Sequence, residues 1–389
     1  PGRYQAALLD PWIPFPSADP GSPGTAPSYS PSAGIRPRAR SVDFIFLPDG
    51  AGGPSRAVRA ERPMSMRILI NVGFLLAFLA CRSGQAQLCV PRWSDEFQSQ
   101  SLSHSAWVGA MFDDGGGPTL YVGGIVQRAG PKFTTGVGRR SGSEWQPLPP
   151  SPDWQNRLVV VYALVEYDDG NGPGLYAATI LEPQGVPDTR QAALSRWRGG
   201  QWTTIARFSG SSGGVGANAL RALAVHDDGS GPALYVGGQF DRVLNGPVVG
   251  YGVARYRDGQ WSGLGAGVGS FNTQVNCMAS FDDGSGPELF VGGRFLSASG
   301  VPARHIARWD GRAWHALGDG VTPAPGISDP VSCVAALNLG DGPALYVGGH
   351  FDMVGATPAT NIAKWDGHAW SALGQGLPSI WTISGVHAL

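Results

Sequence analysis

The sequence predicts an all-β protein made of repeated units of short strands, and three observations support this prediction. Of the 389 residues, 59 are glycine and 32 are proline, so glycine is about twice as frequent as in an ordinary globular protein. Short apolar runs are bounded by Gly, Pro and Asp-Gly turns, whereas no apolar period of 3.6 residues persists. The sequence also repeats itself every 55–59 residues.

Each repeat carries the string Leu-Tyr-Val-Gly-Gly or a close relative. These strings begin at Leu120, Leu175, Leu234, Leu289 and Leu345. An Asp-Asp-Gly turn precedes the first four, and a tryptophan closes each unit at Trp145, Trp202, Trp261, Trp314 and Trp370. In the fourth repeat we expect strands at 275–281, 288–293, 306–309 and 314–317, whereas the first repeat lacks a clear third strand.

Four short antiparallel strands per repeat predict the blade of a β-propeller. Five blades are recognisable, and we expect residues 381–389 and the segment around Trp93 to form parts of a sixth, truncated blade. The paired glycines would let the tryptophan of the next blade approach closely. A β-solenoid or an open β-array is the alternative fold.

The motif Leu-Tyr-Val-Gly-Gly-x-Phe is followed, in the last repeat, by Asn361-Ile-Ala-Lys-Trp-Asp-Gly-x-x-Trp-Ser-Ala-Leu-Gly. Over residues 93–389 this pattern resembles kelch-like propellers, the extracellular repeats of large secreted bacterial proteins, and the propeller of fungal cortical cell-polarity marker proteins. The second repeat departs from it, with Ala177-Ala178 in place of Gly-Gly. The resemblance implies a secreted or surface propeller and supplies no catalytic residues.

Residues 64–86 have the layout of a signal peptide. Arg67 precedes the apolar run 68–80, which is too short to span a bilayer, and small residues at Gly84 and Ala86 favour cleavage before Gln87. We therefore expect residues 87–389 to form a C-terminally truncated propeller that is secreted, periplasmic or on the cell surface. The Pro-rich segment 1–63 is interpreted as upstream or disordered sequence. A lipoprotein anchored through Cys81 is the alternative.

The composition and motifs favour a non-catalytic binding scaffold. A formal net charge of −1 gives no basic field for nucleic acid, and we expect no membrane span, no cofactor and a monomer. The expected partner is a protein or glycan at the cell surface. Alternatives are a propeller hydrolase or lyase with a site in the channel mouth, and a lectin-like glycan binder, so enzymatic activity is left open with no catalytic residue assigned.

Three kinds of candidate site residue emerge. The polar residues that follow Gly-Gly, namely Gln239, Arg294 and His350, are placed to ring the channel mouth as ligand-binding groups, or are ordinary loop starts. The turn carboxylates are weak calcium candidates or simple turn caps: Asp227, Asp228, Asp282 and Asp283. Cys277 and Cys333 occupy the same position in successive repeats, which permits a disulfide if their backbones approach within about 7 Å.

Overall fold

The computed structural model describes Leu102, residues 105–377 and Val386, except residues 131, 156, 184–190, 211–218, 245, 271–272, 326, 328–329 and 341. These described residues all belong to the unit Pro63–Leu389. The leader 1–63, the segment 64–86 with Cys81, Trp93 and, of the predicted segment 381–389, all residues except Val386 lie outside the described residues. The interpretations placed on them therefore stay predictions.

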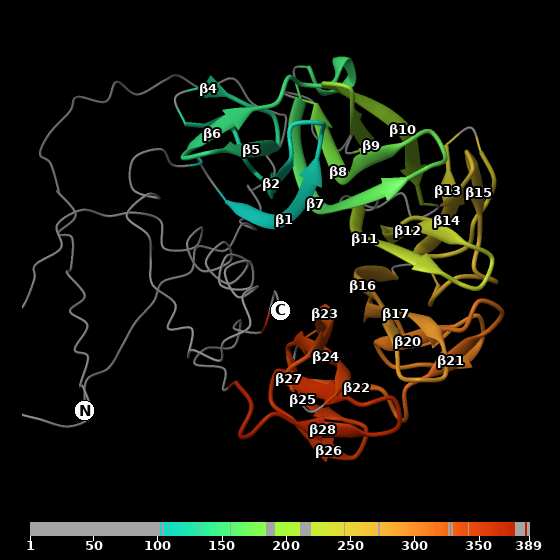
Figure 1. Ribbon diagram of the computed structural model, residues 1–389. Helices are drawn as coiled ribbons and strands as arrows, with labels where there is room; N and C mark the ends of the chain where they lie inside the picture. Colours follow the sequence, from blue (N-terminus) through green and yellow to red (C-terminus); the bar gives the residue numbers. More distant parts are fainter. Residues whose placement is uncertain are drawn as a thin grey trace, which may run out of the picture. The chain divides into compact units, whose positions relative to one another are not determined.

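Five antiparallel sheets follow one another along the described chain, each with four main strands in sequence order (Figure 1). The first sheet contains β1 (Ala106–Asp113), β2 (Pro118–Gly124), β5 (Val137–Ser141) and β6 (Glu144–Pro147). The second contains β7 (Arg157–Asp168), β8 (Pro173–Pro183), β9 (Gln191–Arg198) and β10 (Gln201–Ser209). The third contains β11 (Ala219–Asp227), β12 (Pro232–Gln239), β14 (Val253–Arg257) and β15 (Gln260–Ser262). The fourth contains β16 (Gln274–Asp282), β17 (Pro287–Arg294), β20 (Ile306–Trp309) and β21 (Trp314–Ala316). The fifth contains β23 (Val331–Asn338), β24 (Pro343–Gly349), β27 (Ile362–Trp365) and β28 (Trp370–Ala372).

This arrangement confirms the all-β prediction. In the fourth sheet the predicted strands agree with the observed ones to within one residue at each end. The expectation that the first repeat lacks a clear third strand is wrong, because β5 fills that place and pairs with both β2 and β6. Among the described residues, the structure contains no helix that is both long and apolar enough to cross a membrane.

Short pairings hold the loops between the second and third strands. β3 (Arg128–Ala129) pairs with β4 (Lys132–Phe133), β18 (Ser297–Ala298) with β19 (Val301–Pro302), and β25 (Phe351–Val354) with β26 (Thr357–Pro358). Two further pairings join these loops to the preceding unit: β13 (Arg242–Val243) pairs with β10, and β22 (Val321–Pro323) pairs with β25. The loops are therefore fixed by backbone hydrogen bonds.

The hydrophobic core lies between successive sheets. Leu175 and Ala177 of β8 pack into a buried cluster with residues of the first sheet, whereas Tyr176 and Ala178 pack into a cluster with the third. The same alternation gives buried clusters between the third and fourth sheets and between the fourth and fifth. Because neighbouring residues of a strand point to opposite faces, strands apolar on both faces are the ones that such stacking requires.

The two glycines at the end of each second strand have different roles. A Cβ at Gly237 would lie 2.5 Å from Cγ1 of Val275, which comes from the first strand of the next sheet. A Cβ at Gly238 would lie 1.9 Å from the carbonyl oxygen of Ala219 in its own sheet. The partner across the interface is thus a valine, and the expectation that a tryptophan approaches the glycine pair is wrong. Val386 lies against Gly348 in the same way, and its N–H donates to Gly349 O at 3.1 Å.

The tryptophans of the fourth strands link successive sheets elsewhere. Trp314 Nε1 donates to the carbonyl of Leu264, and Trp370 Nε1 donates to the carbonyl of Leu317, at 2.9 and 3.2 Å. Each acceptor follows the fourth strand of the preceding sheet. The packing of these two tryptophans between repeats, predicted from their spacing, is confirmed.

Candidate functional site

The first strand of every sheet contains a β-bulge at the same place. In β11, Leu220 pairs with Gly238 and Ala222 with Gly237, which leaves Arg221 as the extra residue. The corresponding extra residues of β1, β7, β16 and β23 follow from the same register shifts. We call these five residues the bulge row: Trp107, Tyr162, Arg221, Asn276 and Ser332. Bulges re-aim side chains and are over-represented beside functional sites, so the row is our candidate site.

Side chains of the bulge row contact one another from sheet to sheet. The rings of Trp107 and Tyr162 are 5.3 Å apart between centroids and tilted by 40°. The guanidinium carbon of Arg221 lies 5.1 Å from the Tyr162 centroid, within the range of a cation–π interaction. Further along, Asn276 Nδ2 donates to the carbonyl of Val331 in the fifth sheet at 2.9 Å. The first three side chains of the row therefore form one connected group over three sheets, and Asn276 links the fourth sheet to the fifth.

The bulge row is accessible, because Trp107 is 37% exposed and the other four residues are half-buried. Its charge is positive. In the five first strands, the segment from the strand start to three residues beyond the bulge contains two charged residues, Arg157 and Arg221. The carboxylate nearest to a bulge along these strands is that of Glu166. The described residues offer Arg221 no ion pair, and its Nε is buried without a hydrogen-bond partner.

The three residues predicted to bind ligand lie at the same end of the sheets as the bulge row. Gln239 and Arg294 close β12 and β17, where they pair with Ala219 and Gln274 at the starts of the adjoining first strands. His350 follows β24, and its N–H donates to Pro330 O at 2.8 Å. All three are half-buried and come from three different sheets at equivalent positions. Their role in binding stays a prediction.

The calcium candidates have internal partners. Oδ1 of Asp227 accepts hydrogen bonds from the N–H groups of Gly229 and Gly231, at 2.9 and 2.8 Å, and Asp282 caps its own turn in the same way. In the fifth repeat an asparagine, Asn338, accepts the N–H of Gly340 at 3.0 Å. Because an uncharged side chain accepts the first of these N–H groups there, backbone capping accounts for the residue at the start of the turn.

The second aspartate of the turn binds a tyrosine and an arginine. In the third sheet Asp228 accepts a hydrogen bond from Tyr235 and pairs with Arg255, and Asp283 bonds to Ser285 in the fourth sheet. The first and second sheets have the same kind of triad, Asp114–Tyr121–Arg139 and Asp169–Tyr176–Arg196. Within the described residues, the structure brings together no group of three or more His, Cys, Asp or Glu side chains able to hold a metal ion.

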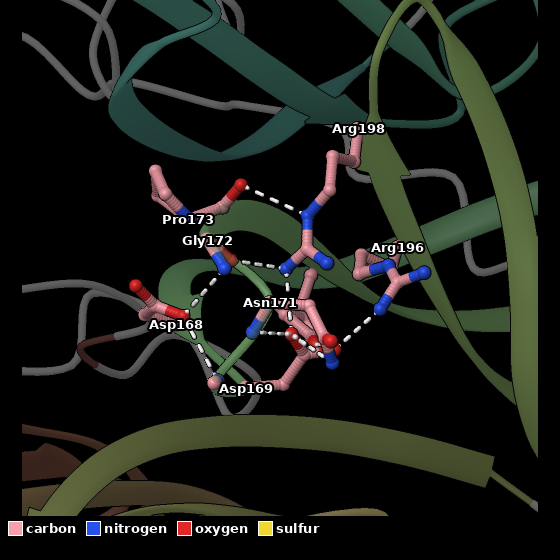
Figure 2. A network of polar contacts seen from close by, with 9 residues as sticks. Asp168, Asp169, Asn171, Gly172, Pro173, Arg196 and Arg198 are labelled. Carbon is pink, nitrogen blue, oxygen red and sulfur yellow. Dashed lines mark hydrogen bonds and ion pairs between the residues drawn. The ribbon is translucent and has the colours of Figure 1, made fainter.

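In the second sheet a further arginine joins the triad, and Figure 2 shows Arg196 and Arg198 both directed at Asp169. Asp169, with only 3% of its side chain exposed, pairs with Arg196 and also with Arg198 Nη2 at 2.8 Å. Burial alone would raise the pKa of Asp169, but hydrogen bonds from Arg198, Tyr176 and the Asn171 N–H hold it well below its usual range. The carboxylate is therefore fully ionised at neutral pH and has a structural role at the turn end, away from the bulge row.

Cys277 and Cys333 are both free thiols, so the predicted disulfide is not formed in the structure. Cys333 Sγ donates instead to the carbonyl of Val386 at 3.4 Å. Burial raises the pKa of the Cys333 thiol to about 12, and burial together with the nearby Cys333 thiol raises the pKa of Cys277 as well. Both groups stay protonated at neutral pH, which makes them poor nucleophiles.

An open pocket of about 710 Å³ lies between the turn ends of the second and third sheets. Its polar lining includes Glu166, Asp168, Arg257 and Asp258. Asp168 caps its turn through Gly170 and Gly172, and Arg257 pairs with Asp258 at 3.3 Å. Asp168 and Arg257 of this pocket thus have partners within the protein, in contrast to Arg221 in the bulge row.

Sequence reasoning missed the bulge row because its five residues are all different. A search for identity between repeats passes over such a position. The available sign was a variable residue between two apolar ones at the start of each first strand, as in Leu220-Arg-Ala and Val275-Asn-Cys. Comparison with known proteins gives no matching family model and no matching curated protein.

Proposed function

We propose that this chain is a secreted or cell-surface β-propeller that acts as a non-catalytic binding scaffold. Three features support the propeller. Each sheet has four antiparallel strands in sequence order, successive sheets stack through apolar faces, and the first strands β1, β7, β11, β16 and β23 contact one another in that order. Val386 packs on the fifth sheet as a further first strand would.

The observation that carries the binding function is the bulge row. The packing residues of the repeats are nearly the same from sheet to sheet, whereas the bulge residues are Trp, Tyr, Arg, Asn and Ser. A scaffold that keeps its core constant and varies one accessible position per unit is suited to recognition. Secretion rests on the signal-like segment 64–86, and recognition at the bulge end also includes the predicted residues Gln239, Arg294 and His350.

The direct test is a binding screen with secreted full-length protein. N-terminal sequencing of the secreted material should give Gln87 as the first residue. The same material, applied to arrays of glycans and of cell-surface proteins, should retain a ligand that mass spectrometry finds chemically unchanged after prolonged incubation. Ligand turnover would overturn the scaffold in favour of a hydrolase or lyase, and a protein that stays in the cytoplasm would overturn the location.

A further inference from the structure

We propose that the bulge row binds an acidic saccharide, with the sugar carboxylate on Arg221 and a sugar ring on Trp107. This inference rests on the proposed binding function and names its ligand class. It follows from the contacts of Trp107, Tyr162 and Arg221, which belong to three successive sheets.

Arg221 supplies the anion-binding group. Its guanidinium is held over Tyr162, its Nε is buried without a partner, and it forms no ion pair with a described residue. Because Nε is covered, the Nη groups of this half-buried side chain are the donors that a ligand oxygen can reach. The planar guanidinium binds a carboxylate through two parallel hydrogen bonds, as the acidic group of a uronic acid would offer.

Trp107 supplies the flat apolar platform. Its ring lies 5.3 Å from that of Tyr162 at a tilt of 40°, and 37% of the residue is exposed. The Trp107 ring and the Arg221 guanidinium both contact Tyr162, so they lie within about 10 Å of each other. That separation suits two linked sugar rings, one stacked through its C–H face on the indole and the other presenting its carboxylate to Arg221.

The geometry favours a saccharide over a peptide. Peptides that bind by adding a strand need a regular free sheet edge, and the bulges interrupt the first strands at this place. Peptides that bind as proline-rich or amphipathic helices need an apolar groove, whereas the rings of Trp107 and Tyr162 pack against each other at a tilt of 40°. A partly exposed aromatic ring beside one cation is the arrangement that an acidic sugar uses.

The experiment measures binding of uronic-acid tetramers to the full-length protein by calorimetry. Galacturonic, glucuronic and mannuronic acid tetramers are each compared with their methyl esters, which keep the sugar and remove the charge. We expect at least one acid to bind at least about tenfold more tightly than its ester, since the ester loses the charge-assisted pair with Arg221. The preference should fall at high salt.

Variants separate the two contacts. Arg221→Gln should reduce the acid-to-ester ratio to within about twofold, whereas Trp107→Ala should weaken acid and ester alike by about tenfold and leave their ratio unchanged. Arg312→Gln, at an exposed arginine in the turn between β20 and β21, is the matched control and should change neither. Thermal melting of each variant shows that a loss of binding is not a loss of folding.

Three results would overturn the proposal. These are no binding of any acid tetramer at millimolar concentration, an acid preference that survives Arg221→Gln, and binding of tetraglutamate as tight as that of the sugars with the same sensitivity to Arg221→Gln. A ligand found on the arrays whose binding is unaffected by Trp107→Ala and Arg221→Gln refutes this inference while leaving the scaffold function intact. Turnover of the tetramers refutes the scaffold instead.

Discussion

The second sheet differs from the other four at the end of its second strand. In the third sheet the pairing of β12 with the third strand, β14, ends at Gly237. The next N–H, that of Gly238, donates to the carbonyl of Gly252, which precedes β14. In the second sheet the ladder continues, because β8 pairs with β9 as far as Leu181. The residues at the positions of Gly-Gly are Ala178 and Thr179, opposite the bulge at Tyr162, so the assignment of Ala177-Ala178 to this place was one residue early.

This difference shows what the second glycine is for. The bulge at Tyr162 forms opposite Ala178 and Thr179, so glycine is not needed for the bulge itself. Thr179 is fully buried, and its hydroxyl donates to the carbonyl of Ala193 at 3.0 Å. Glycine is required where the backbone of the first strand comes too close for any Cβ, as Ala219 O does at Gly238.

The largest expected effect is therefore that of Gly238→Ala. Its Cβ would lie 1.9 Å from a backbone oxygen that cannot rotate away, so we expect a loss of at least about 3 kcal/mol in the free energy of unfolding. Thr179→Gly in the second sheet removes a buried hydrogen bond and adds chain entropy, and should cost about 1–2 kcal/mol. Urea unfolding followed by tryptophan fluorescence measures both. Equal losses of unfolding free energy for the two variants would mean that the ends of β8 and β12 do not differ in their need for glycine.

The turn aspartates offer a second comparison. Asp169 is buried between two arginines, whereas Asp283 bonds to Ser285. In the fourth repeat the position of Tyr176 is held by Phe290, which has no hydroxyl to donate. Asp169→Asn leaves two partly exposed arginines without their carboxylate, and we expect a loss of about 2 kcal/mol after discounting for solvent. Asp283→Asn should cost less than about 1 kcal/mol.

The pH dependence gives an independent check on Asp169. Its pKa is lower in the folded than in the unfolded chain, so its stabilisation is complete above the unfolded value of about 3.9 and is lost as the pH falls below it. The difference in unfolding free energy between wild type and Asp169→Asn should shrink between pH 5 and pH 3. A constant difference over that range would argue against a charge effect.

The comparison between sheets also explains which parts of the fold could be predicted from the sequence. The repeat predicted strand positions because each turn has a local cause, such as Asp227 capping its own loop. It missed β5, because Val137-Gly-Arg-Arg-Ser lacks the Ile-Ala-x-Trp pattern of the later third strands. The contact between Gly237 and Val275 joins two sheets, and spacing along the chain does not determine which residue of the next sheet meets the glycine.

The candidate site was harder still to predict. The bulge row depends on pairing register, which shifts by one residue between Leu220 and Ala222 in the third sheet, and no residue type marks such a shift. The residues that were predicted, Gln239, Arg294 and His350, were found because they follow a recurring motif. Recognition residues are the ones that differ between repeats, so a repeat-based search finds the scaffold more readily than the site.

The smallest expected effect concerns the aromatic position before the turn. The second sheet has Tyr167 there, packed edge-on against Tyr176 at 5.6 Å, and the third sheet has His226 in the same relation to Tyr235 at 5.5 Å. His226 Nδ1 is 2.9 Å from Ser280 Oγ of the fourth sheet, and its buried Nε2 has no partner. A protonated imidazole would carry its charge into this apolar interface.

Burial lowers the pKa of His226, Arg255 lowers it further, and Asp228 and Asp227 only partly oppose this. The unfolded chain therefore binds the proton more readily, so the stability contributed by neutral His226 is complete above about pH 6.5 and is lost as the pH falls below it. His226→Phe, which introduces the residue found at 112 and 281, should remove this loss, on the order of 1 kcal/mol at pH 5.5. Urea midpoints at pH 7.5 and 5.5 measure the change, with His315→Gln at the exposed Asp310 pair as control. If His226→Phe keeps the full acid sensitivity of the wild type, the interface between the third and fourth sheets does not sense this proton.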